Sequence, residues 1–121
     1  MSFVPEIDSK IEPIVRLVAN DRERGLRALQ DLAEAGSKSA ILYLGLYLSE
    51  KPETTDLSLP WLLKANEFDS ADAAWNLAMI ARERGSGDEM RRWIDRAAEL
   101  GEADAKKIRD NGYDVDAVLT G

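Results

Sequence analysis

The stretch WIDRAAELGEADA, residues 93–105, decides the fold because two earlier parts of the chain share its pattern. Three glutamates, three alanines and two tryptophans recur at intervals of 32 or 33 positions. These anchors are Glu34, Glu67 and Glu99; Ala40, Ala73 and Ala105; and Trp61 and Trp93. A period in the low thirties is typical of stacked helix pairs. The sequence therefore predicts an all-α fold built from repeated pairs of antiparallel helices.

Turn residues stand at equivalent places in the three copies. Gly36 and Gly101 lie where a helix would end in a left-handed residue, and Asp69 takes that place in the middle copy. Longer loops, at residues 49–56 and 84–89, separate the other junctions. Tight turns and longer loops therefore alternate, as expected for helix pairs.

These signals define helix boundaries along one domain, residues 1–121. The predicted helices cover residues 9–19, 22–35, 37–50, 58–68, 70–85, 88–100 and 102–111. They group into N-terminal helices at 9–35, repeats at 37–68 and 70–100, a partial repeat at 102–111 and a C-terminal cap at 112–121. Ser9 with Glu12, and Ser86 with Glu89, are predicted capping boxes. Pro60 is expected in the first turn of its helix, where its missing N–H does least harm.

Composition limits the chemistry available to the chain. It has 16 Lys and Arg against 23 Asp and Glu, a net charge of −7, and no Cys or His. This charge disfavours nucleic acid and anionic membranes and favours a basic protein partner. Zinc sites and an imidazole base are excluded, and no cofactor is expected. The longest apolar run, residues 40–48, is far shorter than the ~20 residues of a membrane span, and no leader pattern precedes it, so we expect a cytoplasmic protein.

Three segments resemble a known repeat family. LYLGLYL at 42–48, AWNLA at 74–78 and, above all, WIDRAAELGEADA at 93–105 are similar to Sel-one-like repeats, relatives of tetratricopeptide repeats. The resemblance covers about residues 28–108. It implies a short right-handed α-solenoid of about two and a half antiparallel helix pairs, which binds proteins or peptides and has no catalytic activity.

A second stripe beside the expected core stripe predicts a binding face. In the helix at 70–85, Ala74, Leu77, Ala78 and Ala81 recur at i, i+3, i+4 and i+7, as a core-facing stripe does. Apolar and charged residues next to that stripe, together with two leucines of the helix at 37–50, would line the concave surface of a solenoid. The predicted partner-binding residues are Leu42, Leu46, Asp72, Trp75, Met79 and Arg82. Coverage of this face by the chain's own ends is the alternative.

The remaining features have structural explanations. Trp61 and Trp93 are expected to pack between successive repeats. Opposite charges four residues apart, Asp88 with Arg92 and Arg91 with Asp95, predict ion pairs on a solvated helix rather than a nucleic-acid patch. Gly45 and Ala78 are expected to let the paired helix approach closely.

The sequence predicts a non-catalytic protein-binding module. One form is an immunity or antitoxin-type inhibitor of a basic toxin, because opposite net charge speeds encounter. An adaptor or regulatory scaffold in bacterial signalling or assembly is the other form, and a homodimer through the helix at 37–50 stays open. A metal-dependent enzyme would need carboxylate pairs such as Asp69 with Asp72 or Glu102 with Asp104. These carboxylates stand at helix starts, where capping explains them.

Overall fold

The computed structural model describes residues 11–120, which form an all-α fold with no strand among them. Its helices are α1 (Ile11–Asn20), α2 (Arg22–Glu34), α3 (Lys38–Leu48), the 3₁₀ helix η2 (Pro52–Thr54), α4 (Thr55–Glu67), α5 (Ala71–Glu83), α6 (Gly87–Glu99), α7 (Ala103–Asp110) and α8 (Val115–Thr120). The predicted all-α class is confirmed. Each predicted helix is present with both ends within three residues of the prediction, and part of the predicted C-terminal cap forms α8.

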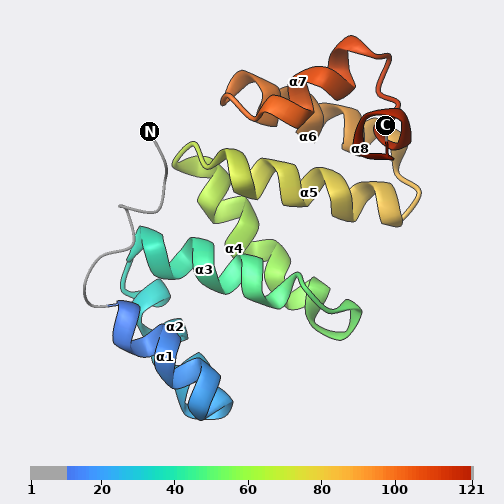
Figure 1. The fold of residues 1–121 in the computed structure, drawn as a ribbon. Coiled ribbons are helices and arrows are strands. Elements are labelled where there is room, and N and C mark those ends of the chain that lie inside the picture. Colours follow the sequence, from blue (N-terminus) through green and yellow to red (C-terminus); the bar gives the residue numbers. More distant parts are fainter. Residues whose placement is uncertain (1–10, 121) are drawn as a thin grey trace.

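Each helix packs against the next one along the chain, and α3 also contacts α5. Figure 1 shows α1 and α2 at one end of the molecule and α7 and α8 at the other, with α3 to α6 between them. The contact between α3 and α5 joins two helices that are separated in sequence by α4. The arrangement therefore advances along one direction, and the two ends of the described chain do not pack together in this view.

The same junction closes α2, α4 and α6. After α2, α4 and α6, the second residue beyond the helix has a left-handed φ, as predicted: 97° at Gly36, 66° at Asp69 and 101° at Gly101. The next N–H then donates to a carbonyl five residues back, a pattern that satisfies the last carbonyls of a helix. These bonds are Ser37 to Leu32 at 3.0 Å, Ser70 to Ala65 at 3.2 Å and Glu102 to Ala97 at 2.9 Å.

A similar junction closes α5, where Gly85 has φ 75° and the Ser86 N–H donates to the Ala81 carbonyl at 2.9 Å. Only residues 84–86 separate α5 from α6, so the longer loop predicted at 84–89 is wrong.

The residue that completes each junction also caps the following helix. Ser37 Oγ accepts the N–H of Ala40 at 3.2 Å, and Ser70 Oγ accepts that of Ala73 at 3.1 Å. In the third copy the Glu102 carboxylate accepts two N–H groups at the start of α7. The predicted capping bond at Ser86 is wrong: Ser86 precedes α6, but its side chain makes no capping hydrogen bond. The predicted box at Ser9 lies outside the described residues.

The helix α4 starts earlier than predicted, which changes the position of Pro60. The helix begins at Thr55, so Pro60 is its sixth residue, and the prediction that it lies in the first turn is wrong. Two hydroxyls hold the preceding turn in place: Thr54 Oγ1 donates to the Leu48 carbonyl at 2.6 Å, and Thr55 Oγ1 donates to the Lys51 carbonyl at 2.9 Å. The 3₁₀ helix therefore leads directly into α4 and adds a turn before the proline.

The core of the described chain consists of two clusters of buried side chains. The N-terminal cluster is Ile11, Leu29, Ala33, Ala40, Ile41, Leu42, Leu44, Leu62, Ala65, Ala73 and Leu77. The C-terminal cluster is Ala74, Ala78, Ala81, Met90, Ile94, Ala97, Ala98, Ala105, Ile108 and Val115. The helix α5 contributes to both, and Trp93 packs against both. This contact agrees with the predicted packing role of Trp93.

Two glycines set how closely neighbouring helices approach. A Cβ at Gly45 would lie 2.9 Å from Leu62 Cδ2, which confirms that this position is kept small for the contact between α3 and α4. A Cβ at Gly25 would lie 2.4 Å from the backbone nitrogen of Val18, so α1 and α2 are closer still. Both contacts are far shorter than ordinary carbon packing at ~3.5–4.0 Å.

Candidate functional site

The six predicted binding residues differ in how far they are buried in the structure. Leu42 is 2% exposed and belongs to the N-terminal cluster, so its prediction as a partner contact is wrong. The helix α3 contacts α2, α4 and α5, which leaves this side chain no route to the surface. Leu46 is half-buried and packs against the same cluster, whereas Asp72 is exposed in the first turn of α5.

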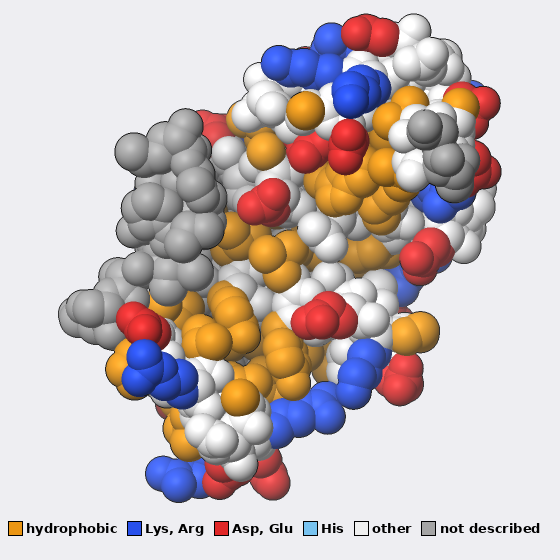
Figure 2. All heavy atoms as spheres, viewed as in Figure 1, with side chains coloured by type: hydrophobic (Ala, Val, Ile, Leu, Met, Phe, Trp, Pro, Cys, Tyr) orange, Lys and Arg blue, Asp and Glu red, His pale blue; other side chains and the backbone are white. Residues whose placement is uncertain are grey.

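The other three predicted residues lie on α5 near the end of the chain. Trp75 and Met79 are half-buried against the C-terminal cluster, against which Val118 of α8 also packs. Arg82 forms an ion pair with Asp116 of α8. Figure 2 shows hydrophobic side chains exposed between α5 and α8. The helix α8 therefore pairs with Arg82, one of the predicted binding residues, while the side chains of Trp75 and Met79 remain partly exposed.

Two further contacts fix the segment that leads to α8. Tyr113 has φ 66°, and its hydroxyl donates to Asp95 Oδ1 at 2.6 Å. This hydrogen bond is the main cause that raises the pKa of Tyr113 above its usual value of 10.0. Arg91 lies over the Tyr113 ring, 5.9 Å from its centroid. The predicted ion pair of Asp95 with Arg91 is wrong: Arg91 pairs with Asp88 at 3.5 Å.

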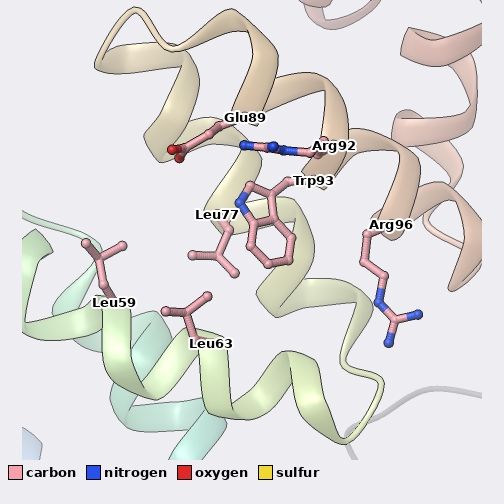
Figure 3. Close-up of a pocket in the computed structure, with 7 residues that line it drawn as sticks. All are labelled: Leu59, Leu63, Leu77, Glu89, Arg92, Trp93 and Arg96. Carbon is pink, nitrogen blue, oxygen red and sulfur yellow. The ribbon is translucent and has the colours of Figure 1, made fainter.

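A hollow lies elsewhere, between α4 and α6 over α5. It measures about 470 Å³ and is lined by Leu59, Leu63, Leu77, Glu89, Arg92, Trp93 and Arg96. We call it the Trp93 hollow. Figure 3 shows Leu59 and Leu63 of α4 facing Leu77 and Trp93 across it. Leu77 is 5% exposed and belongs to the core, whereas Leu63 is 45% exposed at the mouth.

The polar groups of the Trp93 hollow differ in how they are held. Arg96 is fixed, because it donates to Asn66 Oδ1 at 3.0 Å and to Asp69 Oδ1 at 2.7 Å. Arg92 is exposed and forms no ion pair with any residue from 11 to 120. The predicted pair of Arg92 with Asp88 is therefore wrong, since Asp88 pairs with Arg91. The hollow thus presents an apolar floor with one uncommitted guanidinium at its edge.

A second, smaller hollow of similar construction lies nearer the N-terminal end of the described chain. It measures about 280 Å³, lies between α2 and α4 over α3, and is lined by Leu26, Gln30, Leu44, Leu48, Leu57 and Trp61. We call it the Trp61 hollow. Five of its residues stand 32 or 33 positions before residues of the Trp93 hollow. The pairs are Leu26 with Leu59, Gln30 with Leu63, Leu44 with Leu77, Leu57 with Glu89 and Trp61 with Trp93.

Another hollow, of about 210 Å³, lies near the loop after α3. It is lined by Arg22, Tyr47, Glu50, Lys51 and Thr54. Arg22 lies over the Tyr47 ring, 5.9 Å from its centroid, and Tyr43 stacks on the same ring. Burial is the main cause that raises the pKa of Tyr43, followed by the nearby Tyr47 and Glu50.

Two of the four carboxylates that a metal-dependent enzyme would need, Glu102 and Asp69, serve the backbone or an ion pair. Glu102 Oε1 accepts the N–H groups of Asp104 and Ala105 at 2.6 and 3.1 Å. Asp69 pairs with Arg96 at 2.7 Å. Across the part of the chain that the structure describes, no three acidic side chains come together as a metal-binding group. Nor is any helix in this part both long and apolar enough to span a lipid bilayer.

Comparison of the chain with family models, with curated proteins and with solved structures found no match.

Sequence reasoning missed the Trp93 hollow although its signal is present. The repeat spacing predicts a packing role for Trp93, and Trp93 does pack on both clusters, but its ring also lines the hollow. The helix α4 carries leucines on several sides, at Leu57, Leu59, Leu62 and Leu63, which is typical of a helix that is covered all round or that binds a partner. Leu57 and Leu63 are the members that remain exposed, at 62% and 45%.

Proposed function

We propose that this chain is a non-catalytic module that binds another protein, and that an apolar side chain of the partner enters the Trp93 hollow. The observation that carries the proposal is the hollow itself: an open apolar floor with a tryptophan and an uncommitted arginine at its edge. Trp and Arg are the residue types enriched in interface hot spots, and concave apolar sites with few polar groups are typical binding sites.

We further propose that the helices form a short right-handed solenoid of the Sel-one-like and tetratricopeptide type. Three observations support this arrangement. The helix pairs are closed by the same left-handed junction at Gly36, Asp69 and Gly101. The helices α3 and α5, which are equivalent in the repeat, contact each other. The Trp61 and Trp93 hollows are lined by residues at matching repeat positions.

The net charge of −7 supports a partner with net positive charge. Opposite net charge accelerates encounter over distances beyond direct contact, and the effect weakens as salt is added. A basic partner is the feature that an inhibitor of a basic toxin and an adaptor would share. The partner's own activity separates these two forms, because an inhibitor abolishes that activity on binding and an adaptor does not.

The test begins with a photoreactive amino acid at position 63, at the mouth of the Trp93 hollow, in cells that express the chain naturally. The same reagent at Lys106, which is exposed on α7, provides the control. A protein captured from position 63 and not from position 106 is then purified. Its affinity is measured by calorimetry for the wild type and for the variants Leu63→Asp, Arg92→Glu and Trp75→Ala.

We expect Leu63→Asp to weaken binding by about tenfold or more, because it places a charge at an apolar hot spot. Arg92→Glu should weaken it by a comparable factor, and neither change touches a buried side chain. Trp75→Ala should change the affinity by less than about threefold. The opposite pattern, with loss only in Trp75→Ala, would place binding on the α5 face and reject the Trp93 hollow.

A further inference from the structure

The Trp61 and Trp93 hollows are two copies of one feature on either side of α4. Leu57 and Trp61 of α4 line the first, and Leu59 and Leu63 of the same helix line the second. The floors are equivalent as well, because Leu44 of α3 and Leu77 of α5 are 33 positions apart. Between the hollows, the outer side of α4 carries the exposed Leu57, Pro60 and Leu63. An apolar path therefore connects the two hollows.

We propose that one amphipathic helix of the partner crosses α4 and places an apolar side chain in each hollow. This inference rests on the proposed function and specifies its ligand. The floors of the two hollows lie on α3 and α5, which contact each other, and the axes of packed helices are about 8–10 Å apart. Residues seven apart on one face of an α-helix are separated by about 10.5 Å. Residues three apart on an extended strand span a similar distance but point to opposite faces.

The charges beside the path specify the partner further. Arg92 at the Trp93 hollow and Lys64 on α4 are exposed and form no ion pair within the described residues. A carboxylate one turn from the side chain in the Trp93 hollow would pair with Arg92. Glu89 also lines the Trp93 hollow. Its equivalent in the Trp61 hollow is Leu57. The partner helix should therefore carry its acidic residue beside Arg92 at the Trp93 end, and it needs no charge at the mouth of the Trp61 hollow.

The experiment is a selection from a displayed library of random 18-residue peptides on the purified chain. Binding of the selected peptides is then measured for three matched variants, Leu63→Asp, Leu57→Asp and Leu119→Asp. The first two alter the mouths of the Trp93 and Trp61 hollows. Leu119 is 48% exposed on α8 and lines neither hollow, so it controls for adding a charge at an exposed leucine. Circular dichroism of each variant verifies the fold.

The expected peptides are helical on binding, with large apolar residues seven apart and an acidic residue within one turn of one of them. Their affinity should fall about tenfold or more in Leu63→Asp and in Leu57→Asp, and less than about twofold in Leu119→Asp. Arg92→Glu should weaken binding by about fivefold or more, and exchanging the peptide's acidic residue for lysine should restore it in that variant.

Three outcomes would overturn the inference. Peptides whose affinity depends on Leu63 but not on Leu57 would show that only the Trp93 hollow is occupied, which would leave the proposed function in place. Proline-rich peptides with apolar residues three apart would show that the occupant is not an α-helix. A selection with no peptide dependent on either leucine would reject both the inference and the role of the Trp93 hollow.

Discussion

Replacing Gly25 with alanine will destabilise the protein, although alanine is the better helix former. The added Cβ would lie 2.4 Å from the nitrogen, 2.5 Å from Cα and 2.7 Å from Cγ2 of Val18. Carbon atoms in ordinary contact are ~3.5–4.0 Å apart, so α1 and α2 would have to separate by about 1 Å. Two of the three contacted atoms belong to the backbone, so a change of rotamer at Val18 cannot relieve the clash.

Two opposing terms set the size of the effect. Alanine gains about 1 kcal/mol of helix propensity over glycine in a helix interior. Overpacking costs about 1–3 kcal/mol, and a contact against backbone belongs at the upper end of that range. The net loss is therefore about 2 kcal/mol. With an unfolding entropy of about 2.1 cal/mol/K per residue, this loss lowers the melting temperature of the 121-residue chain by about 8 °C.

Thermal unfolding followed by circular dichroism measures this shift. The matched control is Gly87→Ala at the start of α6, where an added Cβ would meet nothing within 4 Å. Gly87→Ala should leave the melting temperature unchanged or raise it slightly, because only the propensity term acts. A melting temperature of Gly25→Ala equal to or above that of the wild type would refute the close approach of α1 and α2.

Three more predictions concern the junctions and the C-terminal segment. Ser70→Ala should lower the free energy of unfolding in urea by about 1 kcal/mol, and Ser86→Ala by clearly less, because only Ser70 makes a capping hydrogen bond. Asp69→Ala should cost about 1–2 kcal/mol at its φ of 66°, whereas Asp69→Gly should stay within about 1 kcal/mol of the wild type, since glycine relieves the strain and only an exposed ion pair is lost. The raised pKa of Tyr113 means that folding favours its protonated form, so its contribution to stability is present below the usual pKa of 10.0 and is lost as pH rises through the folded-state value. The difference in melting temperature between wild type and Tyr113→Phe should therefore shrink above pH 10.0, and a constant difference would contradict this assignment.

Local rules explain why the helices and their junctions could be predicted. Few residue types tolerate a left-handed φ. Gly36, Asp69 and Gly101 therefore identify helix ends without knowledge of the fold. The repeated anchors then fix the order of the elements. The start of α4 could not be predicted in this way, because the hydroxyls of Thr54 and Thr55 extend the helix through bonds to carbonyls before it.

The candidate site depends on distances between helices, which periodicity does not determine. Leu42 has the pattern of an outward residue, but three neighbouring helices cover α3, so it is buried. Trp93 has the pattern of a packing residue, and the space beside its ring depends on the separation of α4 and α6. Long side chains are equally hard to assign. Arg91 and Asp95 were expected to pair, but Asp95 accepts the hydroxyl of Tyr113, which is 18 residues away.

The division of the core across α5 has a consequence for how the molecule opens. Six of the ten buried residues of the C-terminal cluster are alanine, against four of eleven in the N-terminal cluster. Each buried residue of the C-terminal cluster therefore buries less apolar area on average than one of the N-terminal cluster. For this reason α6, α7 and α8 should exchange their amide hydrogens through local unfolding before α3 and α4 do. Trp93 packs against both clusters. A helix seated in the Trp93 hollow would hold α4 and α6 together, so binding should slow amide exchange on both sides of α5 at once.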